Sequence, residues 1–136
     1  MKKLACSFGY AFQGLFTAIK TERNMRIHIV CMIYVYFFLS CFDFFEITRT
    51  ELAIIFIANG LVIGAELINT AIEAAVDMHG EEHTPLGKIA KDCGAGAVLV
   101  FTIFAVLCGV AIMYQPKAFS LLFAYFIENP IAIVLF

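Results

Sequence analysis

Three carboxylates and one amide recur along one helical stripe in the segment GAELINTAIEAAVD, residues 64–77. At 100° per residue, Glu66, Asn69, Glu73 and Asp77 fall within an arc of about 80°. Apolar side chains occupy the opposite face of the same segment. Carboxylates can abstract a proton, and Mg²⁺ is often held by one or two carboxylates together with substrate phosphates. The stripe therefore predicts a functional site.

The stripe continues a long apolar run, so its first residues are expected at membrane depth. A carboxylate near the membrane core costs about 2.5–3.5 kcal/mol on insertion scales, and such residues usually face a cavity, a partner or a metal. Lys91 and Asp92 follow across a polar loop. This combination favours phosphoryl transfer at the membrane surface. Alternatively, Asp77 and Glu73 only pair with Lys88 or Lys91 at the interface.

The composition indicates an integral-membrane protein with one domain. Of the 136 residues, 62% are hydrophobic and 15% are charged, too few to cover the apolar side chains of a water-soluble domain. The net charge of −2 and the lack of a basic tract argue against a nucleic-acid partner. The bilayer is the expected solvent.

The five cysteines are scattered without a C-x-x-C pair, so we expect each to be a small buried apolar residue and not part of a disulfide. His79 and His83 are spaced like a zinc pair, but Gly80 between them favours a loop, and two histidines supply half of the usual ligand set.

The pattern of apolar residues predicts an all-α membrane protein. An amphipathic surface helix is expected first, because apolar residues recur there at spacings of three and four. Three segments reach the length of about 20 residues that a span requires. The apolar tail is broken by Glu128, Asn129 and Pro130, which favours an interfacial or re-entrant piece over a fourth span. The expected bounds are about 3–21 for the surface helix, 27–45, 52–76 and 93–115 for the spans, and 118–136 for the tail.

Basic residues orient these spans. Five lysines and arginines precede the first span, Lys88 and Lys91 lie between the second and the third, and Arg49 stands alone in the remaining loop. By the positive-inside rule, the N-terminus and loop 78–92 are expected to be cytoplasmic. For a bacterial protein this means a multi-pass protein of the cytoplasmic (inner) membrane.

Two segments carry a family resemblance. AELINTAIEAAVD, followed by KIAKDCGAGAVL, resembles the signature of the prokaryotic integral-membrane diacylglycerol kinase family. TERNMRIH before the first span and HTPLGKIAKD before the third are more similar to its undecaprenol kinase branch. The resemblance covers about residues 3–113. It implies a homotrimer with active sites between subunits, which uses Mg²⁺ and ATP to phosphorylate a membrane lipid alcohol, either undecaprenol or diacylglycerol.

The resemblance also implies roles for individual residues. Glu66 matches the catalytic base, Glu73 and Glu22 match metal ligands, and Asn69 matches a polar contact near the transferred phosphate. Asp77 matches a site acid of less defined role. The residues that match ATP contacts are Lys3, Tyr10, Glu22, Glu73, Glu82, His83, Lys91 and Asp92. The family often has Glu-x-His shortly before the Lys-Asp pair, but in this sequence the histidine is shifted by one position relative to Lys91. The adenosine contacts therefore stay open among Glu81, Glu82, His83 and Thr84.

Four polar residues ahead of the first span have two interpretations. They either line the entrance of the site or anchor the helix to lipid headgroups. These residues are Arg23, Asn24, Arg26 and His28.

Two other function classes compete with the lipid kinase. A small ion- or proton-conducting protein would use the acids as a relay, and relays need acids distributed through the membrane depth. Here the acids cluster at one end of the second span, and the third span carries no charge. A purely structural membrane subunit would leave the polar stripe unexplained. The sequence therefore favours the kinase.

Overall fold

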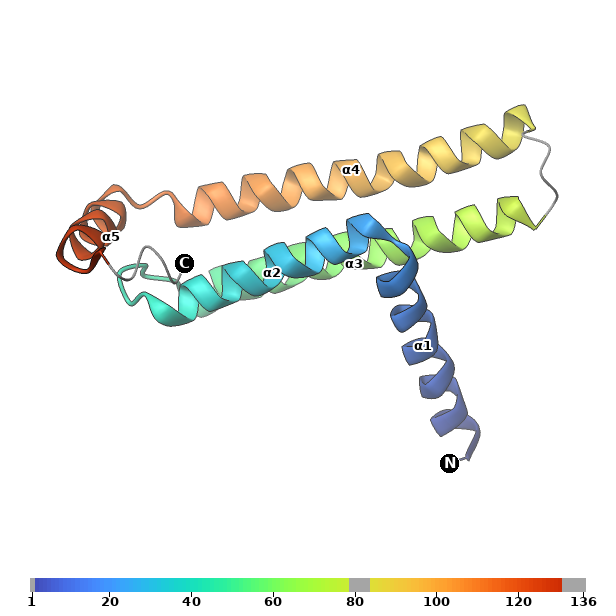
Figure 1. Cartoon of the computed structure of the whole chain (residues 1–136), viewed down its shortest axis with the longest axis horizontal. Coiled ribbons are helices and arrows are strands. Elements are labelled where there is room, and N and C mark those ends of the chain that lie inside the picture. Colours follow the sequence, from blue (N-terminus) through green and yellow to red (C-terminus); the bar gives the residue numbers. More distant parts are fainter. Residues whose placement is uncertain (1, 79–83, 131–136) are drawn as a thin grey trace.

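The computed structural model describes residues 2–78 and 84–130, and all regular secondary structure in these two ranges is helical (Figure 1). The five helices follow one another in the order α1 Lys2–Thr21, α2 Arg23–Cys41, α3 Arg49–Asp77, α4 Pro85–Met113 and α5 Pro116–Glu128.

Three of these helices, α2, α3 and α4, are long and apolar enough to cross a membrane. The predicted all-α membrane fold is therefore confirmed. Their lengths differ: α2 has 19 residues, whereas α3 and α4 have 29 each. At 1.5 Å per residue, α2 is about 28 Å long and α3 and α4 are about 43 Å long. Only α2 matches the hydrocarbon thickness of about 30 Å.

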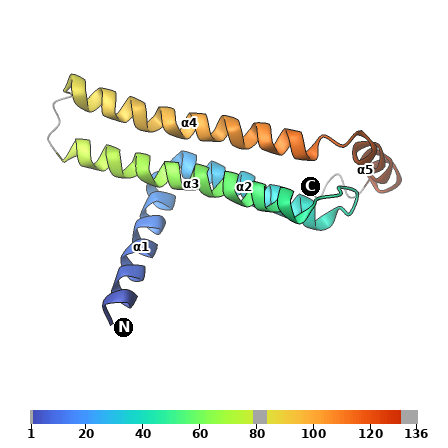
Figure 2. The same ribbon diagram turned by 180° about the vertical axis from the view of Figure 1, so that it is seen from behind.

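α3 is the central helix of the bundle. It packs along α4 over much of its length and more sparsely against α2, and among the described helices α1 contacts α2 and α3. Both views show α1 leaving the side of the bundle, while α3 and α4 continue past the point where α1 meets α2 (Figures 1 and 2). The α3–α4 pair therefore extends beyond the level at which α2 begins.

The elbow between α1 and α2 is fixed by Arg26. Its guanidinium donates from Nη1 to the carbonyl oxygens of Ile19 (3.2 Å) and Lys20 (2.8 Å), which lie at the C-terminal end of α1. A cation there satisfies helix carbonyls that lack partners and complements the helix dipole. Ala18 and Met25 are buried on either side of the turn. Arg26 thus has a structural role, which sequence reasoning did not predict.

Caps define the starts of α3 and α4. Thr48 and Glu51 form a capping box, in which the Thr48 hydroxyl accepts from the Glu51 N–H and the Glu51 carboxylate accepts from the Thr48 N–H. Thr84 accepts from the Gly87 N–H, and Pro85 occupies the first turn of α4. Both helices therefore begin before the apolar segments proposed as spans.

α5 docks on the turn between α2 and α3 through an aromatic cluster. Phe42 and Phe45 of this turn are buried, and Phe45 makes an edge contact with Phe119 of α5. Phe42 contacts Tyr125 and Phe126 with ring centroids 5.8 and 6.0 Å apart. α5 has 13 residues, about 20 Å, which is too short to cross a bilayer.

The expectation of buried cysteines is wrong within the chain. Cys6, Cys31, Cys41 and Cys93 are exposed and Cys108 is half-buried, because their side chains lie on outer faces of the helices. All five are free thiols. The zinc pair proposed for His79 and His83 lies outside the described residues.

Candidate active site

Glu66 is the most buried charged side chain of the described chain, with 2% of its surface exposed. It lies on α3 and faces His28 of α2, whose Nε2 is 3.2 Å from Glu66 Oε1. A second polar contact joins the same two helices further along, where the Asn59 amide donates to the Tyr36 hydroxyl over 2.9 Å. The antiparallel packing of α2 on α3 therefore aligns polar residues of both helices.

The next residues of the stripe are tied to one another. The Asn69 amide donates from Nδ2 to Glu73 Oε1 over 2.9 Å, within one turn of α3. Asn69 is 8% exposed, and its Oδ1 is buried with no hydrogen-bond partner among the described residues. Gly94 of α4 lies directly opposite, where a Cβ atom would collide with Asn69 Oδ1. Gly94 thus lets α4 approach the stripe closely enough to bury Asn69.

Asp77 closes the stripe at the end of α3. Lys91 of α4 donates from Nζ to Asp77 Oδ1 over 2.6 Å, and both side chains keep part of their surface exposed. Asp92, the neighbour of Lys91, is exposed. The stripe therefore faces α2 at Glu66 and α4 at Asn69 and Asp77.

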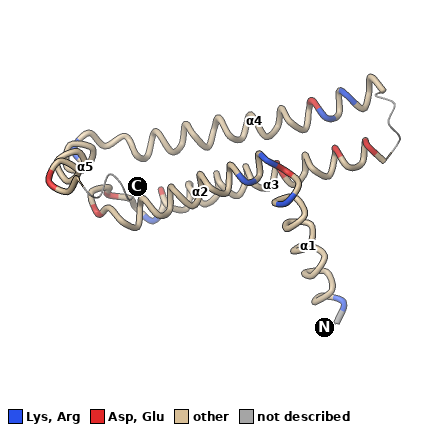
Figure 3. Tube along the Cα trace, in the orientation of Figure 1, with Lys and Arg blue, Asp and Glu red and all other residues tan. Residues whose placement is uncertain are grey.

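Carboxylates gather around Glu66. Glu22, at the elbow before α2, and Glu73 both lie close enough for their charges to act on the Glu66 carboxyl group. The Thr21 hydroxyl donates to Glu22 Oε1 over 3.0 Å. Figure 3 shows acidic and basic residues along α3 and α4 at this end of the bundle, then an uncharged stretch of spans toward α5.

The donor set suits a magnesium ion that is completed by substrate phosphates. Two carboxylates, Glu22 and Glu73, approach the same region, and the buried Asn69 Oδ1 is a further oxygen without a partner. No group of three or more His, Cys, Asp or Glu side chains in residues 2–78 and 84–130 is arranged to hold a metal. A dedicated all-protein metal cage is therefore absent from this part of the chain.

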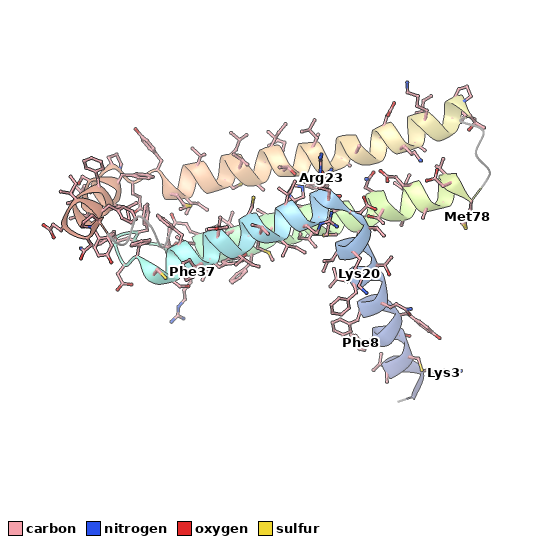
Figure 4. All side chains as sticks on the ribbon, in the orientation of Figure 1. Lys3, Phe8, Lys20, Arg23, Phe37 and Met78 are labelled. Carbon is pink, nitrogen blue, oxygen red and sulfur yellow. The ribbon has the colours of Figure 1, made fainter. Side chains whose placement is uncertain are left out.

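The predicted site residues of α1 are not brought to this cluster. Lys3 lies near the free end of α1, away from Arg23 at the elbow and from Met78 at the end of α3 (Figure 4). Tyr10 lies on α1 and is 74% exposed. Glu82 and His83 lie outside the described residues, as does Glu81.

A groove begins at His28 and runs between α2 and α4, with α3 as its floor. Its first part has a volume of about 220 Å³, and a second part of about 60 Å³ continues it toward Met113. Val35, Asn59, Ala105 and Gly109 line both parts. The lining is mostly apolar, and the groove could accommodate a hydrocarbon chain whose polar end lies near His28 and Glu66.

Sequence reasoning found the stripe but missed its partners. His28, Gly94 and the groove depend on the register between helices that are far apart in the sequence. The nearest sequence signal was the eight-residue segment TERNMRIH, in which the histidine enters the first span. A pairing of His28 with Glu66 could not be read from spacing alone.

Comparisons with known proteins identify a family and several relatives of similar sequence. The sequence model of the family described as prokaryotic diacylglycerol kinase matches residues 9–113. The undecaprenol kinase of Bacillus subtilis (strain 168) is 40% identical over 111 residues, which cover 82% of this chain and 87% of that protein.

Other relatives are diacylglycerol kinases, among them proteins of Synechocystis sp. and Escherichia coli. The protein of Synechocystis sp. is 38% identical over 114 residues, 83% of this chain but 63% of the relative. The protein of Escherichia coli (strain K12) is 33% identical over 107 residues, 79% of this chain and 85% of the relative.

Replacing Gly94 with alanine tests the contact between α4 and the stripe. Because the new Cβ would collide with Asn69 Oδ1, we expect Gly94→Ala to lower stability by about 1–3 kcal/mol, the usual cost of overpacking. Gly96→Ala is the matched control, since a Cβ at Gly96 meets nothing within 4 Å. Thermal unfolding in detergent micelles measures both. Equal stability of the two variants would contradict this packing.

Proposed function

Because the chain belongs to the prokaryotic diacylglycerol kinase family, it is a lipid kinase, and we propose that it transfers the γ-phosphate of ATP directly to the primary hydroxyl of undecaprenol. The observation that carries the proposal is the position of Glu66, a buried carboxylate in contact with His28, which lines the head of an apolar groove. An acid there can accept a proton from a hydroxyl group held in the membrane.

We assign Glu66 the role of general base. Its carboxylate would take the proton of the lipid hydroxyl as the lipid oxygen bonds to the γ-phosphorus and the bond to ADP breaks. Burial excludes water, which would otherwise compete with the lipid as the acceptor of the phosphoryl group. A positioned base typically contributes about 10²–10⁴-fold to the rate.

The nucleotide would be bound by the part of the stripe beyond Glu66. Glu73 and Glu22 would hold Mg²⁺ between them and the phosphates, as proposed from the resemblance. The bound ion would offset the negative charge of the phosphate oxygens. Lys91 would turn from Asp77 to the phosphates, because an ammonium on a flexible stem can exchange one anion for another. Asp92, exposed beside Lys91, would accept from donors of the nucleotide.

The lengths of the helices support a separation between lipid and nucleotide. The contact between His28 and Glu66 places Arg23, the first residue of α2, level with about residue 71 of α3. If α2 spans the bilayer, Glu73 and Asp77 lie beyond the membrane surface and Glu66 lies just beneath it. We propose that this surface is cytoplasmic and that α1 lies along it, since the basic residues gather there.

The groove supports undecaprenol over diacylglycerol. It runs lengthwise between α2 and α4, and its continuation toward Met113 has a volume of about 60 Å³. This small volume suits a single hydrocarbon chain better than the two chains of a diacylglycerol. The undecaprenol kinase from Bacillus subtilis, one of the relatives of the chain, points the same way. A preference for diacylglycerol as the phosphorylated lipid would contradict this assignment.

We also propose that the chain acts as a homotrimer with shared active sites, as the resemblance implies. The three spans bury few of their residues within one chain, which leaves wide apolar faces for lipid or for other copies. Lys3 lies near the free end of α1 and Tyr10 on the same helix is exposed, so they could reach nucleotide at a neighbouring site. Sedimentation of the protein in micelles would show three chains, and a monomer that retains full activity would contradict the proposal.

The relay alternative receives no support from the structure. A proton or ion relay requires acids that are distributed through the depth of the membrane. Beyond Glu66, the described spans contain no charged residue until the end near α5 (Figure 3). The polar stripe therefore serves one surface of the membrane only.

Substitution of the two glutamates separates their roles. Glu66→Gln should keep binding of Mg-ATP but lower kcat by about 10²–10⁴-fold, because it removes the base. Glu73→Gln should instead weaken binding of nucleotide in the presence of magnesium, because Mg²⁺ has few protein ligands. Calorimetry across a magnesium titration, together with steady-state rates, measures both effects. Full activity of Glu66→Gln, or equal loss of nucleotide binding in both variants, would overturn the assignment.

Filling the groove tests where the lipid binds. A leucine at Gly109 meets no neighbouring atom at its Cβ and would project into the groove, so we expect the KM for lipid to rise about tenfold and the KM for Mg-ATP to stay unchanged. Gly60→Leu on the exposed face of α3 is the matched control.

The assay uses labelled ATP with undecaprenol or diacylglycerol in mixed micelles. Wild-type protein should phosphorylate undecaprenol with the higher kcat/KM. A preference for diacylglycerol would contradict the proposed substrate, and an unchanged lipid KM in Gly109→Leu would contradict the proposed groove.

A further inference from the structure

The pair formed by His28 and Glu66 joins two helices at the head of the groove. His28 Nε2 lies 3.2 Å from Glu66 Oε1, and the exposed fractions of the two side chains are 19% and 2%. Apart from this ion-pair contact, Glu66 Oε1 is buried and has no hydrogen-bond partner among the described residues. The imidazole is therefore the polar group available to hold this oxygen.

The other charged groups near Glu66 are acidic. Glu22 at the elbow and Glu73 one stripe position beyond Asn69 both add negative charge around it, and the Nε2 atom of His28 lies against its Oε1. Two basic side chains at this end of the bundle have other hydrogen-bond partners. Arg26 donates to carbonyl oxygens of α1, and Lys91 donates to Asp77. The imidazole of His28 is thus the group with an N–H donor that lies against the Glu66 carboxylate.

His28 also lines the groove, whereas Glu66, which His28 contacts, is not one of the lining residues. An N–H donor on Oε1 fixes one carboxylate oxygen and leaves Oε2 free to accept a proton. A carboxylate without this donor could rotate and present either oxygen, or neither, to a hydroxyl at the groove head. Orientation of a base relative to its proton donor contributes strongly to rate.

We propose that His28 is a positioning residue: its Nε2–H donates to Glu66 Oε1 and orients Oε2 toward the lipid hydroxyl. This inference rests on the proposed role of Glu66 as the base and adds the residue that orients it. The proton of the lipid hydroxyl goes to Glu66 Oε2, and the N–H bond of His28 stays intact throughout the transfer.

Two substitutions at position 28 test the donor directly. His28→Leu removes the donor, and we expect kcat to fall about 10- to 100-fold, the effect of one hydrogen bond to a charged group. His28→Gln keeps an N–H donor at nearly the place of Nε2 and should retain most of kcat. Neither should change the KM for Mg-ATP. Tyr36→Phe, which removes the other polar contact between α2 and α3, controls for altered helix packing and should keep kcat.

Equal loss of activity in His28→Leu and His28→Gln would overturn the proposal, as would full activity of His28→Leu. In a Glu66→Gln background, His28→Leu should cause no further loss, because the group it orients is already gone. An additional loss there would show that His28 acts independently and would contradict the inference. Full activity of Glu66→Gln alone would instead contradict the proposed base, so the two failures are distinguishable.

Discussion

The difference in length between α2 and its two neighbours is the constraint on which the rest of the structure depends. α2 matches one bilayer thickness, and α3 and α4 exceed it by about 15 Å. Because α2 packs antiparallel on α3 with His28 facing Glu66, most of the excess of α3 and α4 lies on one side, beyond the elbow between α1 and α2. We infer that one continuous helix thereby carries a lipid-facing base and water-exposed nucleotide ligands.

This arrangement resolves a conflict between two substrates that need different solvents. A lipid hydroxyl stays near the membrane surface, whereas ATP stays in water, and both must meet at one phosphorus atom. Glu66 and Glu73 are seven residues apart, about 10 Å along α3, so a single rigid element spans the boundary. The elbow fixed by Arg26 brings Glu22 to the same level, and Gly94 lets α4 pack closely over Asn69.

At the opposite end, the aromatic cluster holds α5 against the turn between α2 and α3. The family match ends at residue 113, before α5.

Much of the fold could be predicted because it follows from local pattern. Apolar runs of sufficient length and the helical spacing of Glu66, Asn69 and Glu73 are properties of consecutive residues, and they gave the all-α membrane fold and the stripe. The partners of the stripe could not be predicted, because His28 and Gly94 meet it through helix packing. The exposed cysteines were missed for the same reason, since apolar surroundings in sequence do not show which face of a helix points outward. The aromatic cluster depends on the turn between α2 and α3, which ends at the Thr48–Glu51 capping box. The spacing of Thr48 and Glu51 is a sequence signal for the start of a helix, but the prediction of the second span followed the apolar pattern instead.

The most direct test of this account is a depth profile along α3. Single spin labels would be placed at exposed positions of a cysteine-free variant in bilayers, namely Ile57, Leu61, Ile68 and Met78. At each position, the relaxation of the label by oxygen, which partitions into the membrane, would be compared with its relaxation by a polar reagent, which stays in water. The account predicts that oxygen dominates at residues 57 and 61, that the two become comparable near residue 68, and that the polar reagent dominates at residue 78. Dominance of oxygen at residue 78 would place Glu73 and Asp77 inside the membrane, and dominance of the polar reagent at residue 61 would place Glu66 in water. Either result would contradict the separation of lipid and nucleotide along one helix.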